Sequence, residues 1–151
     1  MTQLQDGIFP VESDDYPRVV EVWEASVRAT HHFVAEADIE IFRPIVQSAV
    51  PDLTSMCMRD TDGKVAGYIS VSSGIVHMLF IHPDWRGKGI GKWLLRYAID
   101  FLEATTLDVN EQNAQAVGFY LHMGFEVAGR SELDGTGKPY PLLHMRLTTN
   151  K

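Results

Sequence analysis

Apolar residues recur at helical spacing in the first third of the chain. In residues 12–34 they include Val19 and Trp23 on one side, preceded by acidic residues that can cap a helix. The stretch EADIEIFRPIVQSAV, residues 36–50, has similar spacing, and its Pro44 predicts that a second helix breaks or starts afresh there. The pattern therefore predicts a helical N-terminal region.

Strand patterns follow in the middle of the chain. Residues 55–60 and 64–72 are largely apolar and flank the turn DTDGK, which is typical of a hairpin. The stretch IVHMLFIH, residues 75–82, predicts a buried third strand that continues this meander.

Helices and strands alternate in the last third. They are helix 92–104, strand 106–110, helix 113–124, and a pair of strands, 125–133 and 140–149. A glycine turn, with Gly135 and Gly137, separates the last two strands. This order predicts an α/β fold in a single domain over residues 1–151, with a mixed central sheet flanked by helices.

Composition favours a soluble globular protein, because 45% of the residues are apolar and 22% are charged. Cys57 is the only cysteine, so no intrachain disulfide can form and a reducing compartment is expected. The chain has no charged-then-apolar leader and no apolar run near 18 residues. We therefore expect a cytoplasmic protein that does not interact with a membrane.

The charge of the chain is unevenly distributed. Residues 1–75 hold 12 acidic and 5 basic residues, whereas residues 76–151 hold 8 of each. In the second half, a small cationic cluster from Arg86 to Arg96 suits a compact polyanion such as a cofactor phosphate. It is too small for a nucleic-acid-binding face. The acidic half could attract a cationic acceptor or could simply be a solvated surface.

Three glycines, Gly87, Gly89 and Gly91, lie between the predicted third strand and the helix that follows. Their spacing fits neither a nucleotide P-loop nor the dinucleotide-binding Gly-x-Gly-x-x-Gly pattern. What remains is a basic glycine loop that opens a helix. Such a loop lets the backbone approach an anion, with free N–H groups and the positive end of the helix dipole directed at it.

Two segments resemble the signatures of the GNAT superfamily of acetyl-CoA-dependent N-acetyltransferases. They are LFIHPDWRGKGIGKWLL and NEQNAQAVGFYLHMGF, and the resemblance extends over residues 8–148 in the order of the elements. The C-terminal stretch GRSELDGTGKPYPLLHMRL is also similar to small bacterial members of that superfamily.

The resemblance implies roles for individual residues. The backbone of the loop would hold the pyrophosphate of acetyl-CoA, through Arg86, Gly87, Lys88, Gly89, Ile90, Gly91 and Lys92. Leu79, Phe80 and Ile81 would pair with the pantetheine arm, and Asn113 would touch it. Tyr120 would lie near the sulfur and protonate the leaving thiolate, although an aromatic core position explains it as well.

Transfer to an amine also calls for a general base. An amine with a pKa of about 10.4 is only about 0.04% neutral at pH 7, so a base or a water chain is useful. In the best-known members of the superfamily, a carboxylate on the strand before the glycine loop acts as the base. Its position here is occupied by Ile75. His77 shares strand parity with Leu79 and Ile81 and is our predicted replacement, with a structural histidine as the alternative.

His31 and His32, at the end of the first helix, are predicted to line the acceptor cleft; they could also be polar positions favoured near a helix C-terminus. The six histidines and one cysteine show no metal-ligand spacing, so we expect no metal.

The sequence thus predicts an N-acetyltransferase that moves the acetyl group from acetyl-CoA to an amine of a small molecule or peptide by direct attack in a ternary complex. The alternative is a non-catalytic acyl-CoA-binding sensor or partner-docking module, and Tyr120 favours the enzyme. The acceptor stays open, since an antibiotic, a polyamine, an amino acid and a protein N-terminus all fit. An edge strand near the C-terminus is compatible with a homodimer.

Overall fold

Two helices and a meander form the N-terminal half of the computed structural model, which describes residues 2–148. Helix α1 (Tyr16–Thr30) and helix α2 (Glu36–Ala49) precede strands β2 (Thr54–Arg59), β3 (Val65–Ser72) and β4 (Ile75–Ile81). A two-residue strand, β1 (Phe9–Pro10), pairs with β2 and was too short to be predicted. Short 3-10 helices cover Ser13–Asp15, Val50–Asp52 and Pro83–Trp85.

The C-terminal half continues with helix α3 (Ile90–Phe101), β5 (Thr106–Asn110), helix α4 (Ala114–His122), β6 (Phe125–Ser131) and β7 (Leu142–Leu147). All seven strands form one sheet in the order β1-β2-β3-β4-β5-β7-β6, with β4 and β5 parallel. The predicted α/β class with a mixed sheet is confirmed. The expected last strand ran to Thr149, which lies outside the described residues.

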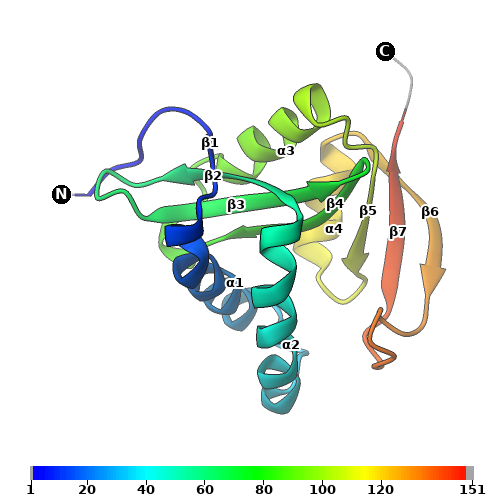
Figure 1. The fold of residues 1–151 in the computed structure, drawn as a ribbon. Helices are drawn as coiled ribbons and strands as arrows, with labels where there is room; N and C mark the ends of the chain where they lie inside the picture. The colour runs from blue at the N-terminus through cyan, green and yellow to red at the C-terminus, as the bar shows by residue number, and fades with distance from the viewer. Residues whose placement is uncertain (1, 149–151) are drawn as a thin grey trace.

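Helices cover both faces of the sheet (Figure 1). On one face, Val19 and Trp23 of α1 pack with Ile39 of α2 and Tyr68 of β3. On the other, α3 and α4 pack through a larger core whose fully buried members include Leu94, Leu95, Ile69 and Met145. Each such side chain stabilises the fold by about 1.5–3 kcal/mol relative to exposure. No helix in residues 2–148 has the length and apolar character needed to cross a bilayer.

Pro44 does not interrupt the second helix, so the predicted break is wrong. Helix α2 runs from Glu36 to Ala49 with Pro44 inside it. Proline removes the hydrogen bond to the carbonyl four residues earlier, that of Glu40. Glu40 and Pro44 are both exposed, so water can satisfy that carbonyl.

A β-bulge in β4 changes the faces to which its side chains point. Ser70 pairs with Met78 but Val71 pairs with Val76, which leaves His77 as an extra residue. Val76 and Leu79 therefore belong to the same core, although they are three residues apart. The alternation of faces along β4 is interrupted between Val76 and Met78, and the face to which His77 points stays a prediction.

Strands β4 and β5 pair over two residues only and then separate. Their partners are Ile75 with Thr106 and Val76 with Leu107, after which β5 pairs solely with β7 as far as Asn110. Beyond Val76, the edge of β4 that faces β5 has main-chain N–H and C=O groups that form no hydrogen bonds to another strand within residues 2–148. This separation creates the site described next.

Candidate active site

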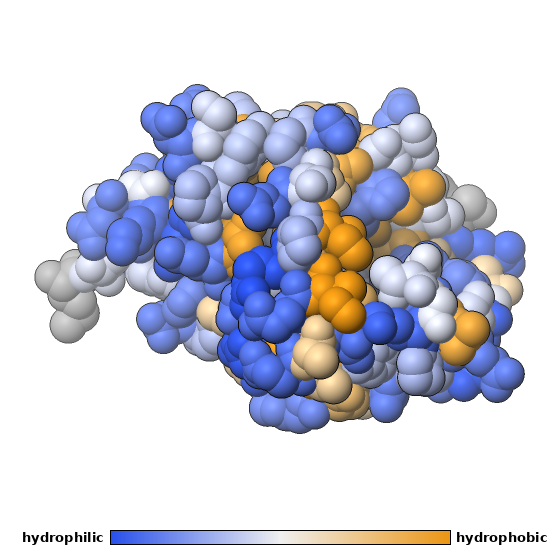
Figure 2. All heavy atoms as spheres, turned by 60° about the horizontal axis from the view of Figure 1, so that its bottom comes forward, coloured by the Kyte–Doolittle hydropathy of each residue, from blue (hydrophilic) through white to orange (hydrophobic). Residues whose placement is uncertain are grey.

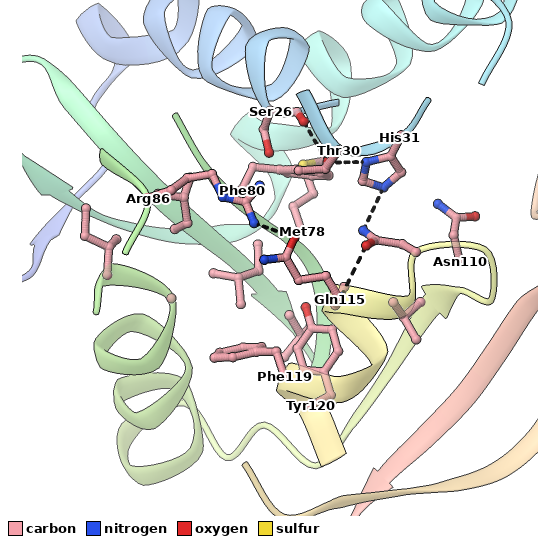
Figure 3. A pocket seen from close by; sticks show the side chains of 18 of the residues that line it. Ser26, Thr30, His31, Met78, Phe80, Arg86, Asn110, Gln115, Phe119 and Tyr120 are labelled. Carbon is pink, nitrogen blue, oxygen red and sulfur yellow. Dashed lines mark hydrogen bonds between the residues drawn. The ribbon is translucent and has the colours of Figure 1, made fainter. Parts of the chain in front are cut away.

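A cavity of about 440 Å³ occupies the gap between β4 and β5. The end of α1, the loop before α3 and the first turns of α4 close its sides. Figure 2 shows the face at the bottom of Figure 1, where an apolar strip lies exposed between hydrophilic side chains. Figure 3 shows the polar residues that project into the cavity, from α1, the glycine loop, β5 and α4.

The glycine loop has the backbone geometry of an anion site. Gly87 and Gly89 have φ angles of 77° and 85°, which other residues rarely adopt, and Gly89 is the N-cap of α3. Among the described residues, none accepts a hydrogen bond from the N–H groups of residues 87–92. These donors and the helix dipole suit a pyrophosphate. The guanidinium of Arg86 donates to Oε1 of Gln115 at 2.9 Å and so joins the loop to α4.

Most of the predicted loop residues line the cavity: Arg86, Gly87, Gly89, Ile90, Gly91 and Lys92. Lys88 is exposed and is not part of the lining. On the strand side, Leu79, Phe80 and Ile81 all border the cavity, along the part of β4 that β5 has left. An extended ligand could pair there with the main chain, as the pantetheine prediction requires.

Tyr120 is anchored by its ring and has a free hydroxyl. The residue is 8% exposed, and its ring contacts Phe119 and Phe125 at centroid distances of 5.3 and 6.1 Å. Its hydroxyl points into the cavity in Figure 3 and has no hydrogen-bond partner within residues 2–148. Burial raises the pKa of Tyr120 well above its usual range, so the phenol keeps its proton.

Asn113 and His31 meet across the cavity. The side-chain oxygen of Asn113 caps α4 by accepting from the N–H of Ala116 at 3.2 Å, which directs the amide nitrogen toward His31 Nε2, 3.5 Å away. On its other side, His31 Nδ1 lies 2.7 Å from the Thr30 hydroxyl, which donates to the carbonyl of Ser26. This chain is satisfied when His31 donates from Nδ1 and accepts at Nε2.

Burial lowers the pKa of His31 to about 4, with a smaller contribution from the nearby His32. His31 is therefore neutral at physiological pH. His32 is exposed and does not line the cavity. His77 lines the cavity at the bulge and is exposed.

Several lining residues were missed from the sequence. Asp108 and Asn110 alternate with the buried Leu107 and Val109 on β5, so strand parity could have placed both on one face. Ser26 and Thr30 also line the cavity, but nothing in their spacing distinguishes them from other polar positions of a helix.

A comparison with known protein families identifies the family of this chain. Residues 51–148 match the family model of the acetyltransferase (GNAT) domain. The chain belongs to the GNAT acetyltransferase family. It is an acetyl-CoA-dependent N-acetyltransferase, as predicted, and acetyl-CoA is the acyl donor of this GNAT fold.

Curated relatives of this GNAT enzyme include the peptidyl-lysine N-acetyltransferase YjaB of two bacteria. The Salmonella typhimurium protein is 41% identical over 128 residues, covering 85% of this chain and 88% of the relative. The Escherichia coli protein is 40% identical over 127 residues, covering 84% and 86%.

Solved structures show the same fold. The solution structure of apo YjaB from Escherichia coli superposes with a TM-score of 0.87 and 36% identity, covering 95% of this chain and 98% of that one. A PaiA N-acetyltransferase from Thermoplasma acidophilum in complex with coenzyme A has a TM-score of 0.72 at 20% identity, covering 94% and 98%. This second likeness concerns the fold alone.

Proposed function

We propose that this GNAT enzyme acetylates the side-chain amine of lysine in a peptide or protein. The observation that carries the proposal is the cavity between the separated strands β4 and β5, which joins a pyrophosphate-type loop to a free tyrosine hydroxyl. The choice of lysine is supported by relatives at 40–41% identity that are named peptidyl-lysine N-acetyltransferases.

The loop and β4 fit the two parts of the donor. The N–H groups of residues 87–92 would hold the pyrophosphate, with Arg86 kept beside them by Gln115. Leu79, Phe80 and Ile81 would pair with the pantetheine arm through their main chain, and Asn113 would bind it from α4. The two anchors fix the thioester in the cavity, which lowers the entropic cost of the reaction.

Transfer then needs one proton donor and one proton acceptor. The amine nitrogen forms a bond to the acetyl carbon, the carbon–sulfur bond breaks, and the leaving thiolate takes the proton of Tyr120. A raised pKa makes the phenol a weak acid on its own. Negative charge develops on the sulfur at hydrogen-bond distance from the Tyr120 hydroxyl, and this charge favours transfer of the proton from oxygen to sulfur.

The proton of the amine goes to a base in the cavity, directly or through water. His77 stays the predicted base because it lines the cavity at the bulge and is exposed to solvent.

A cytoplasmic location, a homodimer and the absence of a metal stay predictions from the sequence.

Two matched peptides test the proposed acceptor. One contains a single internal lysine and a blocked N-terminus, and the other has a free N-terminus and no lysine. After incubation with acetyl-CoA, we expect mass spectrometry to find one acetyl group on the lysine peptide alone. Modification of only the free N-terminus would refute lysine specificity while leaving acetyl transfer intact.

A further inference from the structure

Three polar residues on neighbouring strands form a hydrogen-bonded row beside the cavity. Asp108 on β5 pairs directly with His144 on β7, and Ser131 lies on β6. His144 Nδ1 is 2.6 Å from Oδ1 of Asp108, and His144 Nε2 is 2.6 Å from the hydroxyl of Ser131. The sequence separates these residues by 36 and 13 positions.

The direction of this row distinguishes it from a nucleophilic serine site. Asp108 lines the cavity, whereas His144 and Ser131 do not. In a serine hydrolase the hydroxyl faces the substrate and the carboxylate lies behind the histidine. Here the order is reversed, so the group presented to a ligand is the carboxylate.

Hydrogen bonding fixes how that carboxylate is presented. A carboxylate only accepts, so His144 Nδ1 must carry the proton that it donates to Oδ1. The Ser131 hydroxyl lies 2.6 Å from Nε2 and holds the other side of the imidazole ring. The second oxygen of Asp108, Oδ2, has no partner within residues 2–148, and the side chain is 53% exposed. One oxygen is held and the other stays available.

We infer that Asp108, oriented by His144 and Ser131, receives the ammonium group of the acceptor before transfer. This inference rests on the proposed function, because it concerns the amine that the cavity acetylates. An ammonium donates three hydrogen bonds, and a carboxylate with one free oxygen on the wall of the cavity is its natural partner. Asp108 thereby selects cationic amines, and His144 is a positioning residue that acts through it.

Steady-state kinetics with the lysine peptide test the inference. Asp108→Asn keeps the shape of the side chain and removes its charge, so the KM for the lysine peptide should rise about 10- to 100-fold with a much smaller change in kcat. An aminooxy peptide of the same sequence is uncharged at neutral pH, and its KM should change less than threefold. Asp100→Asn, at an exposed position of α3, serves as the matched control and should behave as wild type.

Variants of the supporting residues separate positioning from folding. The side-chain amide of asparagine can donate where Nδ1 of histidine does, so His144→Asn should keep the wild-type KM within about twofold. His144→Leu lacks a donor and should raise the KM about 3- to 10-fold, with Ser131→Ala smaller in the same direction. Thermal stabilisation by coenzyme A should persist in all of these variants, which shows that the donor site is folded.

The outcomes distinguish the two proposals. If wild type does not acetylate the lysine peptide, the proposed function fails. If wild type is active and Asp108→Asn has an unchanged KM, or raises the KM of the uncharged peptide equally, the ammonium site is overturned alone. A fall in kcat without a rise in KM would likewise place Asp108 in the chemical step and contradict the inference.

Discussion

Val76 of β4 and Leu107 of β5 form the last pair between these two strands. Beyond them β5 turns to β7 alone, and the exposed main chain of β4 becomes a wall of the cavity. The short pairing therefore explains why this sheet contains a cavity, since a full β4–β5 ladder would leave no room for one.

The glycine loop should make the protein more stable in the presence of coenzyme A. Coenzyme A at a concentration 100 times its dissociation constant adds about 2.7 kcal/mol to the free energy of unfolding. Gly89→Val should abolish this gain, because a side chain is strained at a φ of 85° and would block the approach of a phosphate to the loop backbone. Differential scanning fluorimetry with and without coenzyme A measures both effects.

Gly63→Val is the matched control for the loop. Gly63 has a φ of 86°, so the strain is similar, but it lies in the turn between β2 and β3 with no neighbouring atom within 4 Å of an added Cβ. This variant should lose about 1–2 kcal/mol of its free energy of unfolding and so melt at a lower temperature. It should keep the full stabilisation by coenzyme A. Loss of the shift in both variants would show that destabilisation, not the loop, explains the result.

Tyr120→Phe should lower kcat by about 10²- to 10⁴-fold, the range expected when a proton donor is lost. Coenzyme A affinity should change little because the phenyl ring keeps its contacts with Phe119 and Phe125. Tyr97→Phe, on α3 outside the cavity, is the control and should retain full activity. Near-wild-type turnover in Tyr120→Phe, with chemistry rate-limiting, would return Tyr120 to the core-aromatic interpretation.

His31 should make stability depend on pH. Its pKa is about 4 in the folded protein, below the usual 6.5. Between these values the unfolded chain binds a proton that the folded protein does not, so the free energy of unfolding falls as pH drops below about 6.5. The full effect, reached below pH 4, amounts to about 3 kcal/mol.

Urea unfolding of wild type and His31→Gln at pH 7.5 and pH 4.5 measures this contribution. The variant should lose less stability than wild type on acidification, by about 2 kcal/mol. NMR titration of the ring protons of His31 gives the pKa directly. A midpoint near 6.5 would contradict the burial argument.

Pro44→Ala should stabilise the protein. Pro44 lies inside α2 at an exposed position, where alanine restores a helical hydrogen bond. Proline costs about 3 kcal/mol in a helix interior, offset by its smaller entropy in the unfolded chain, so we expect a gain of about 1–2 kcal/mol. Chemical denaturation measures the gain, and an unchanged or lower midpoint would indicate that α2 depends on the proline for its packing.

Periodicity predicted most of the fold, and glycine spacing predicted a loop suited to an anion before α3. Strand β5 was predicted over its observed residues, Thr106–Asn110, between two helical patterns. The loop from Arg86 to Gly91 was found because glycines at fixed spacing before a helix have few structural explanations.

Features that depend on long-range register could not be found in this way. The bulge at His77 lies in a stretch that reads as an unbroken apolar strand, and only pairing with β3 shows that a residue is extra. Asp108, His144 and Ser131 come together because β7 lies between β5 and β6, an order that local patterns do not specify. These three residues were therefore missed from the sequence.

A single-turnover experiment tests the central claim most directly. Enzyme in excess over acetyl-CoA is mixed with the lysine peptide, and free thiol and Nε-acetyl-lysine are quantified over time. We predict that both appear at the same rate, in equal amounts up to the acetyl-CoA added, and that Tyr120→Phe slows both together. Binding of acetyl-CoA without transfer, or thiol release without acetylated lysine, would contradict the account.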